Sequence, residues 1–87
     1  MRLMIVDDEP LVRIGIRTIL EARSPAYEIA GEAGDGLSAA AMALELKPDL
    51  ILVDVKMPFM NGLEFIERVK PSLPRTRYVV LSCVNEF

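Results

Sequence analysis

The 87-residue sequence contains no histidine and no tryptophan, and its only cysteine is Cys83. Without histidine, neither a His-ligated zinc site nor a His-based catalytic triad can form. A single cysteine cannot form an internal disulfide, which fits a reducing cytoplasm. Histidine chemistry and a fold stabilised by internal disulfides are therefore excluded.

The sequence also lacks basic clusters and long hydrophobic runs. Its 10 lysines and arginines against 13 aspartates and glutamates give a net charge of −3, so we expect no direct nucleic-acid binding. No apolar run approaches the roughly 20 residues that cross a bilayer. Only a few apolar residues precede the acidic Asp7 and Asp8, so the opening segment is too short for a secretory signal. We therefore expect a soluble, cytoplasmic protein with no membrane partner.

What the sequence does contain is an alternation of short apolar runs and helical segments. Its length allows one small domain that buries roughly 60–65% of its unfolded surface. The patterns predict strands at residues 3–7, 27–33, 49–54 and 77–82, and helices at about 10–23, 36–46 and 61–70. Parallel strands with right-handed helical crossovers predict an α/β fold, a doubly wound, flavodoxin-like sheet of strand order 2-1-3-4.

Several helix boundaries carry local signals. Pro10 suits a first helical turn, and Pro48 and Pro71 block helix extension. Asn61, with Glu64 three residues later, predicts a capping box at the start of the third helix.

Three aspartates stand at the ends of two predicted strands. Asp7 and Asp8 follow the apolar run 3–6, and Asp54 closes the run 50–53. Ligands of open parallel sheets bind beyond the carboxyl ends of the strands, where the winding direction reverses. If strands one and three are neighbours, three carboxylates meet in one crevice, and such a cluster is costly without a cation. The sequence therefore predicts a site for a hard divalent metal, Mg²⁺.

Simpler explanations exist for each aspartate alone. Asp8 could cap the first helix and Asp7 could end a strand. Asp54 at the mouth of an apolar strand is harder to explain in this way, and jointly the three favour a site.

These residues also resemble a known family. Residues 7–10 (Asp-Asp-Glu-Pro), residues 49–58 with 61–64 (Asn-Gly-Leu-Glu), and residues 79–82 (Val-Val-Leu-Ser) are similar in order and spacing to the receiver domain of two-component response regulators. The resemblance covers the whole chain. The ending, residues 81–87, also resembles receivers joined to AraC-type helix-turn-helix output domains.

The resemblance implies a specific chemistry. Asp54 would be the phosphoacceptor, taking a phosphoryl group from a sensor histidine kinase or a small phosphodonor. Mg²⁺ would be held by Asp8 and Asp54, with Asp7 acting through water and Lys56 contributing its backbone carbonyl. Ser82 would contact the phosphoryl oxygens and so report their presence. Such a domain is a signalling module rather than an enzyme, and at most promotes its own phosphorylation and dephosphorylation.

The resemblance also implies a longer pattern. In the family, a further helix, a fifth strand ending in lysine and a final helix follow. We therefore expect residues 1–87 to be the incomplete N-terminal portion of a receiver domain, followed in the full-length protein by a transcriptional output domain that binds DNA.

Other functions fit less well. The alternative that stays open is a receiver-like interaction module that is not phosphorylated. A flavodoxin-type cofactor module would need a loop that binds phosphate, whereas residues 7–10 repel it. An aspartate-nucleophile phosphohydrolase would usually carry its second acid two positions after the first, whereas here the acids are adjacent.

The first predicted helix has an unusually wide apolar surface. Apolar side chains cover an arc of about 240°, and the residues concerned are Leu11, Val12, Ile14, Ile16, Ile19 and Leu20. Arg13, Arg17 and Glu21 form the remaining polar stripe. One sheet face cannot cover this arc, and the fourth strand would form an apolar sheet edge, so we expect a symmetric homodimer.

Overall fold

The computed structural model describes residues 1–23 and 25–81, which form one parallel sheet with helices on both of its faces. Its strands are β1 (Arg2–Val6), β2 (Glu28–Ala33), β3 (Leu50–Asp54) and β4 (Arg77–Leu81). They lie in the order β2-β1-β3-β4, and each neighbouring pair is parallel. The predicted doubly wound topology is therefore confirmed.

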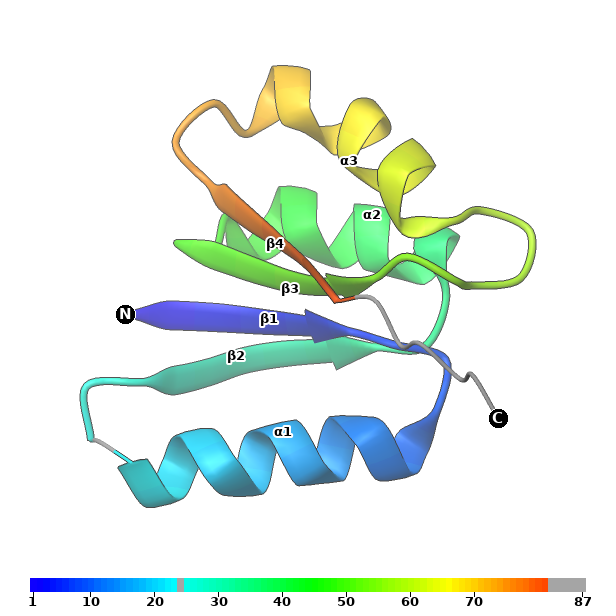
Figure 1. Ribbon diagram of the computed structural model, residues 1–87. Coiled ribbons are helices and arrows are strands. Elements are labelled where there is room, and N and C mark those ends of the chain that lie inside the picture. The colour runs from blue at the N-terminus through cyan, green and yellow to red at the C-terminus, as the bar shows by residue number, and fades with distance from the viewer. Residues whose placement is uncertain (24, 82–87) are drawn as a thin grey trace.

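The helices follow the predicted pattern closely. They are α1 (Pro10–Arg23), α2 (Gly36–Leu46) and α3 (Gly62–Val69), and a 3₁₀ turn, η1 (Lys70–Ser72), follows α3. Figure 1 shows α2 and α3 packed together on one face of the sheet, while α1 runs beside β2. Within the described ranges, no helix has the length and apolar character needed to cross a membrane.

Element ends differ from the predicted bounds by about one residue. Strand β1 begins at Arg2 and ends at Val6, so Asp7 lies just beyond it. Helix α3 ends before Pro71, as predicted, and Pro71 is accommodated within η1. Ser82, the last residue of the fourth predicted strand, lies outside the described residues.

The capping box at the start of α3 is confirmed. The Glu64 backbone N–H donates to Asn61 Oδ1 at 2.9 Å, and the Asn61 backbone N–H donates to Glu64 Oε1 at 3.1 Å. Because these two bonds satisfy backbone donors that a helix end leaves unpaired, they fix where the chain leaves the loop after β3.

The main core lies between the sheet and the α2–α3 layer. Its largest fully buried members on this side alternate along the central strands and lie one turn apart on α3; they are Met4, Val6, Ile51, Val53, Phe65 and Val69. Helix α2 approaches closely because it presents alanines, and Gly31 of β2 leaves room for it. A β-carbon at Gly31 would lie only 2.7 Å from Met42 Sδ.

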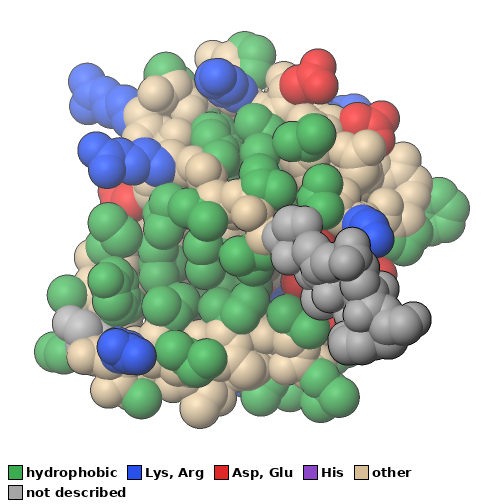
Figure 2. Space-filling view, viewed as in Figure 1, with side chains coloured by type: hydrophobic (Ala, Val, Ile, Leu, Met, Phe, Trp, Pro, Cys, Tyr) green, Lys and Arg blue, Asp and Glu red, His purple; other side chains and the backbone are tan. Residues whose placement is uncertain are grey.

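The opposite face of the sheet is only partly covered. Leu3 and Ile5 of β1 are buried there, yet α1 itself contains no buried residue, and Leu11 is 80% exposed. Ile14 and Ile19 are exposed as well. Figure 2 shows hydrophobic side chains gathered over the sheet above α1. Much of the apolar arc that the sequence predicted to lack cover is thus exposed in the described structure, while Ile16 and Leu20 are half-buried.

The end of α2 provides a test of local strain. Exposed Lys47 closes this helix in the left-handed conformation, with φ 48° and ψ 60°. A β-carbon is unfavourable there by about 1–2 kcal/mol, whereas glycine adopts this conformation readily. We expect Lys47→Gly to raise the free energy of unfolding by about 1 kcal/mol in urea denaturation, once the larger unfolded-state entropy of glycine is subtracted from the relief of strain. Lys47→Ala keeps the β-carbon and should gain nothing; equal gains in both variants would contradict the strain explanation.

Candidate functional site

The three aspartates meet at the carboxyl ends of β1 and β3. Val6 pairs with Val53 across these strands, so Asp7 and Asp54 leave the sheet side by side. Carboxylate oxygens of Asp7, Asp8 and Asp54 all lie within 4.8 Å of one another. Asp7 and Asp54 are only 4% and 9% exposed, whereas Asp8 faces solvent. The structure therefore brings together all three predicted side chains.

Hydrogen bonds to its backbone and its side chain hold Asp7 in place. Its backbone N–H donates to the Ala33 carbonyl at 3.0 Å, which extends the pairing of β1 with β2 by one residue. Its Oδ1 accepts from the Glu9 backbone N–H at 2.8 Å, and its carbonyl accepts from Arg13 Nη1. The contact from Arg13 was not predicted: the sequence showed a polar stripe on this helix, but not what the stripe faces.

Burial raises the pKa of Asp7 above its ordinary value, since the ionised form loses hydration. The N–H donated by Glu9 lowers the pKa, and the nearby charges of Asp54, Asp8 and Glu9 raise it again. The net shift is upward, so the fold disfavours the ionised form of Asp7. A bound cation would favour that form.

Asp54 lies at the start of a tightly anchored loop. The Lys56 backbone N–H donates to Asp54 Oδ1 at 3.2 Å, and the Gly62 N–H donates to the Val55 carbonyl at 3.1 Å. A β-carbon at Gly62 would collide with the Asp54 backbone carbonyl, so glycine lets α3 begin directly against the site. Within the loop, fully exposed Phe59 has a φ of 69°, an unfavourable conformation for a bulky residue.

The donor set fits a hard divalent cation. Three carboxylates offer oxygen ligands to one point, which is the chemistry that Mg²⁺ prefers. Lys56 lies at the same turn, and coordination by its carbonyl stays a prediction. Ser82 and Cys83 lie outside the described residues, so the position predicted for Ser82 is not tested.

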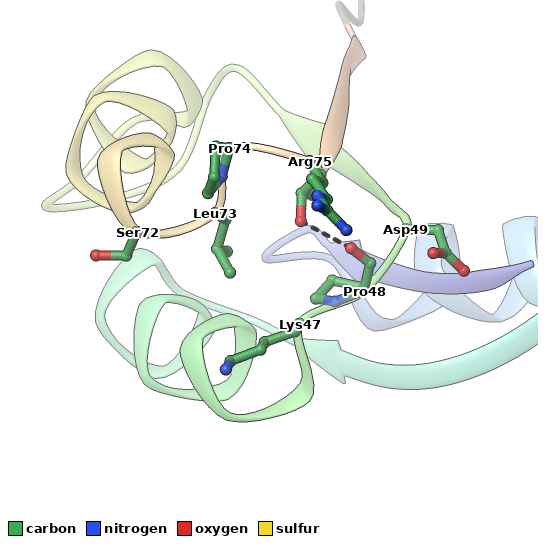
Figure 3. A pocket seen from close by; sticks show the side chains of 8 residues that line it. Lys47, Pro48, Asp49, Ser72, Leu73, Pro74 and Arg75 are labelled. Atoms are coloured by element: carbon green, nitrogen blue, oxygen red, sulfur yellow. Dashed lines mark hydrogen bonds between the residues drawn. The ribbon is translucent and has the colours of Figure 1, made fainter.

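A separate cavity lies at the opposite end of the sheet, where the strands begin. It has a volume of about 360 Å³ and lies between residues 47–49, which precede β3, and residues 72–76, which precede β4. Figure 3 shows Lys47, Arg75 and Asp49 around it, with the hydrogen bond from Thr76 Oγ1 to the Pro48 carbonyl at 2.7 Å. The amino ends of the strands border this cavity, so it forms no part of the acidic site.

Comparison with known proteins agrees with this geometry. The family model for the response regulator receiver domain matches residues 3–86. The chain is 42% identical over 81 residues to YxjL, an uncharacterized transcriptional regulatory protein of Bacillus subtilis, and this match covers 93% of the chain but 37% of YxjL. The chain thus spans well under half the length of this curated relative.

Two solved structures show the same fold. The response regulator domain of Thermotoga maritima CheB superposes with a TM-score of 0.89 at 36% identity, over 99% of this chain and 63% of that one. The isolated REC domain of Salmonella enterica RcsB, solved with the phosphomimetic BeF₃⁻, gives 0.87 at 28% identity over 99% and 64%. With the family match over nearly its whole length and the strand order β2-β1-β3-β4, the chain belongs to the response regulator receiver domain family of two-component systems.

Proposed function

We propose that this signalling module accepts a phosphoryl group on Asp54, with Mg²⁺ held by Asp8 and Asp54, and thereby switches an output domain. The observation that carries the proposal is the convergence of three carboxylates, with oxygens within 4.8 Å of one another, at two neighbouring strand ends. A carboxylate can act as a covalent nucleophile toward phosphorus, and phosphoryl transfer needs positioning and charge neutralisation above all.

By the family resemblance, Asp54 is the nucleophile. Its Oδ1 accepts the Lys56 backbone N–H, which orients the carboxylate so that the second oxygen can attack phosphorus. The P–N bond of a phosphohistidine then breaks as the new P–O bond forms, and the electron pair stays on the imidazole. When bound, Mg²⁺ neutralises charge on the transferring group.

The remaining residues have supporting roles in this proposal. Asp7 holds the metal through water, and the Lys56 carbonyl supplies a further oxygen. Ser82 contacts the phosphoryl oxygens; in support of this role, it follows Leu81 in the sequence, and Leu81 pairs with Asp54 across β3 and β4.

The proposed partners are a sensor histidine kinase as phosphodonor and an output domain in the same protein. A transcriptional output is supported by the relative YxjL, which is named a transcriptional regulatory protein. An AraC-type output domain is proposed only from the sequence of residues 81–87. A receiver-like interaction module without phosphorylation is the alternative.

Magnesium binding can be tested through stability. Mg²⁺ at ten times its dissociation constant should stabilise the native state by about 1.4 kcal/mol, or roughly 5–10 °C in melting temperature for a domain of this size. Asp8→Ala should abolish this rise, because it removes the exposed carboxylate of the cluster.

Asp7→Asn should raise the melting temperature without Mg²⁺, since the raised pKa of Asp7 means that its ionised form opposes folding at neutral pH.

Thermal melts with and without millimolar MgCl₂ measure both effects. Asp35→Asn is a matched control, because Asp35 caps α2 and is not one of the three clustered carboxylates, so it should leave the Mg²⁺ response intact. An equal rise in the parent chain and in Asp8→Ala would reject this metal site.

Phosphorylation can be tested by intact mass. In a full-length version of the protein, treatment with acetyl phosphate and Mg²⁺ should add one phosphoryl group that hydroxylamine removes, and Asp54→Asn should stay unlabelled. Ser82→Ala should be labelled yet fail to switch the output. Label on Asp54→Asn would move the acceptor elsewhere, and a parent chain that takes up neither phosphoryl nor beryllofluoride would favour the interaction module.

We further propose that the 87-residue chain self-associates as a symmetric dimer. Val79 and Val80 are exposed on the edge strand β4, and Leu11 and Ile19 are exposed on α1. At about 25 cal/mol per Å² of apolar surface, the burial forgone on α1 amounts to several kcal/mol. That is comparable with the roughly 5–15 kcal/mol stability of a whole domain.

Light scattering across a dilution series measures this association. The double variant Leu11→Lys, Ile19→Lys should weaken it, whereas Leu37→Lys, on the exposed surface of α2, should not. A compact parent monomer that melts cooperatively at micromolar concentration would contradict the dimer.

A further inference from the structure

We infer that Arg13 is a positioning residue for the metal site and fixes the peptide between Asp7 and Asp8; this rests on the proposed Mg²⁺ site. Arg13 lies in the first turn of α1, and its Nη1 donates to the Asp7 carbonyl at 2.5 Å. That carbonyl belongs to the peptide unit that joins the two aspartates. A helix side chain therefore holds the backbone from which two of the three carboxylates project.

This bond completes the restraint of the turn. The Asp7 N–H is bonded to the Ala33 carbonyl at 3.0 Å, and Asp7 Oδ1 accepts from Glu9 at 2.8 Å. Because Arg13 donates to the Asp7 carbonyl, both backbone groups of Asp7, the N–H and the carbonyl, are hydrogen-bonded. Asp8 is exposed and lacks the burial that immobilises Asp7, so the direction of its carboxylate depends on this backbone.

Arg13 is itself held in place. Its Nε lies 3.7 Å from Glu32 Oε1 on β2, and the side chains of both residues are only 21% exposed. Arg17 Nη1 pairs with Glu32 Oε2 at 2.6 Å, so one glutamate connects two arginines of α1. Gly34 leaves room for the guanidinium, since a β-carbon there would lie 3.2 Å from Arg13 Nη1. We call Arg13 and Glu32 the α1 clamp.

The charge of Arg13 and its position affect metal binding in opposite directions. A cation close to the carboxylates repels Mg²⁺, so removing the charge alone would tighten Mg²⁺ binding. Removing the restraint lets the Asp7–Asp8 peptide turn away from the productive geometry, which weakens binding. Substitution of groups that orient metal ligands typically weakens affinity about 10–100-fold. The sign of the change therefore separates the two effects.

The test is calorimetric titration of MgCl₂ into the chain and its variants, well below each melting temperature. Arg13→Gln should weaken Mg²⁺ binding about tenfold. Arg17→Gln is the matched control: it also removes one arginine partner of Glu32 but has no bond to Asp7, and its affinity should stay within about twofold of the parent's. Equal affinities in Arg13→Gln and the parent, or tighter binding in Arg13→Gln, would overturn the inference.

A second variant reaches the same contact without removing charge. The φ of Gly34 is not positive, so Gly34→Ala brings no backbone strain and only crowds the guanidinium of Arg13. It should weaken Mg²⁺ binding by a smaller factor. Because both substitutions act through one hydrogen bond, adding Gly34→Ala to Arg13→Gln should cause no further loss. Full additivity of the two effects would contradict the inference.

A metal-free measurement separates this inference from the proposed function. The amide nitrogen of Asp8 shares its peptide with the Asp7 carbonyl, so loss of the Arg13 bond should shift the Asp8 amide resonance in NMR spectra without Mg²⁺. Arg17→Gln should leave that resonance in place. A parent chain that binds no Mg²⁺ would refute the proposed metal site, whereas an unmoved Asp8 resonance in Arg13→Gln would refute the clamp whether or not metal binds.

Discussion

The parallel pairing of β1 with β3 is the constraint on which the site depends. Asp7 and Asp54 become neighbours only because Val6 pairs with Val53. A slip of one residue would turn each side chain of β3 to the other face of the sheet, so the alternation along β3, where Ile51 and Val53 are buried and Leu52 only partly buried, fixes this register. The packing that stabilises the core and the geometry that gathers the carboxylates are thus the same interaction.

Bringing the three carboxylates together lowers the stability of the folded state locally. The backbone N–H groups of Glu9 and Lys56 each donate to one carboxylate, but such neutral donors do not cancel the charge of the cluster. The pKa of Asp7 stays raised, chiefly by burial and also by the charges of its neighbours. The core on the α2–α3 side offsets this cost, so the fold can keep an arrangement that is favourable only with a cation or a protonated carboxylate.

Most of the fold could be predicted because its signals are local. Apolar runs gave the strands, and the Asn61–Glu64 pair gave the start of α3. The clustering of the three aspartates was predictable for a related reason, since the predicted strand order placed the carboxyl ends of β1 and β3 side by side. The left-handed residues Lys47 and Phe59 were not predictable, because neither residue type favours that conformation. The partner of Arg13 was also hidden, since the polar stripe is visible in the sequence but its orientation depends on distant Glu32.

Helix α1 is oriented unlike most surface helices. Arg13 and Arg17 are half-buried and face Glu32, while Leu11 is largely exposed. Ion pairs that are this exposed to solvent contribute about 0–1 kcal/mol to the stability of the fold, whereas full burial of one leucine contributes about 1.5–3 kcal/mol. The orientation therefore forgoes stability within the described structure. In return, this orientation lets the Arg13 guanidinium donate a hydrogen bond to the Asp7 carbonyl, a contact that an apolar side chain cannot make. Within the described structure, this orientation of α1 makes the contact at the acidic turn, and it leaves Leu11 and Ile19 on the surface that the proposed dimer would cover.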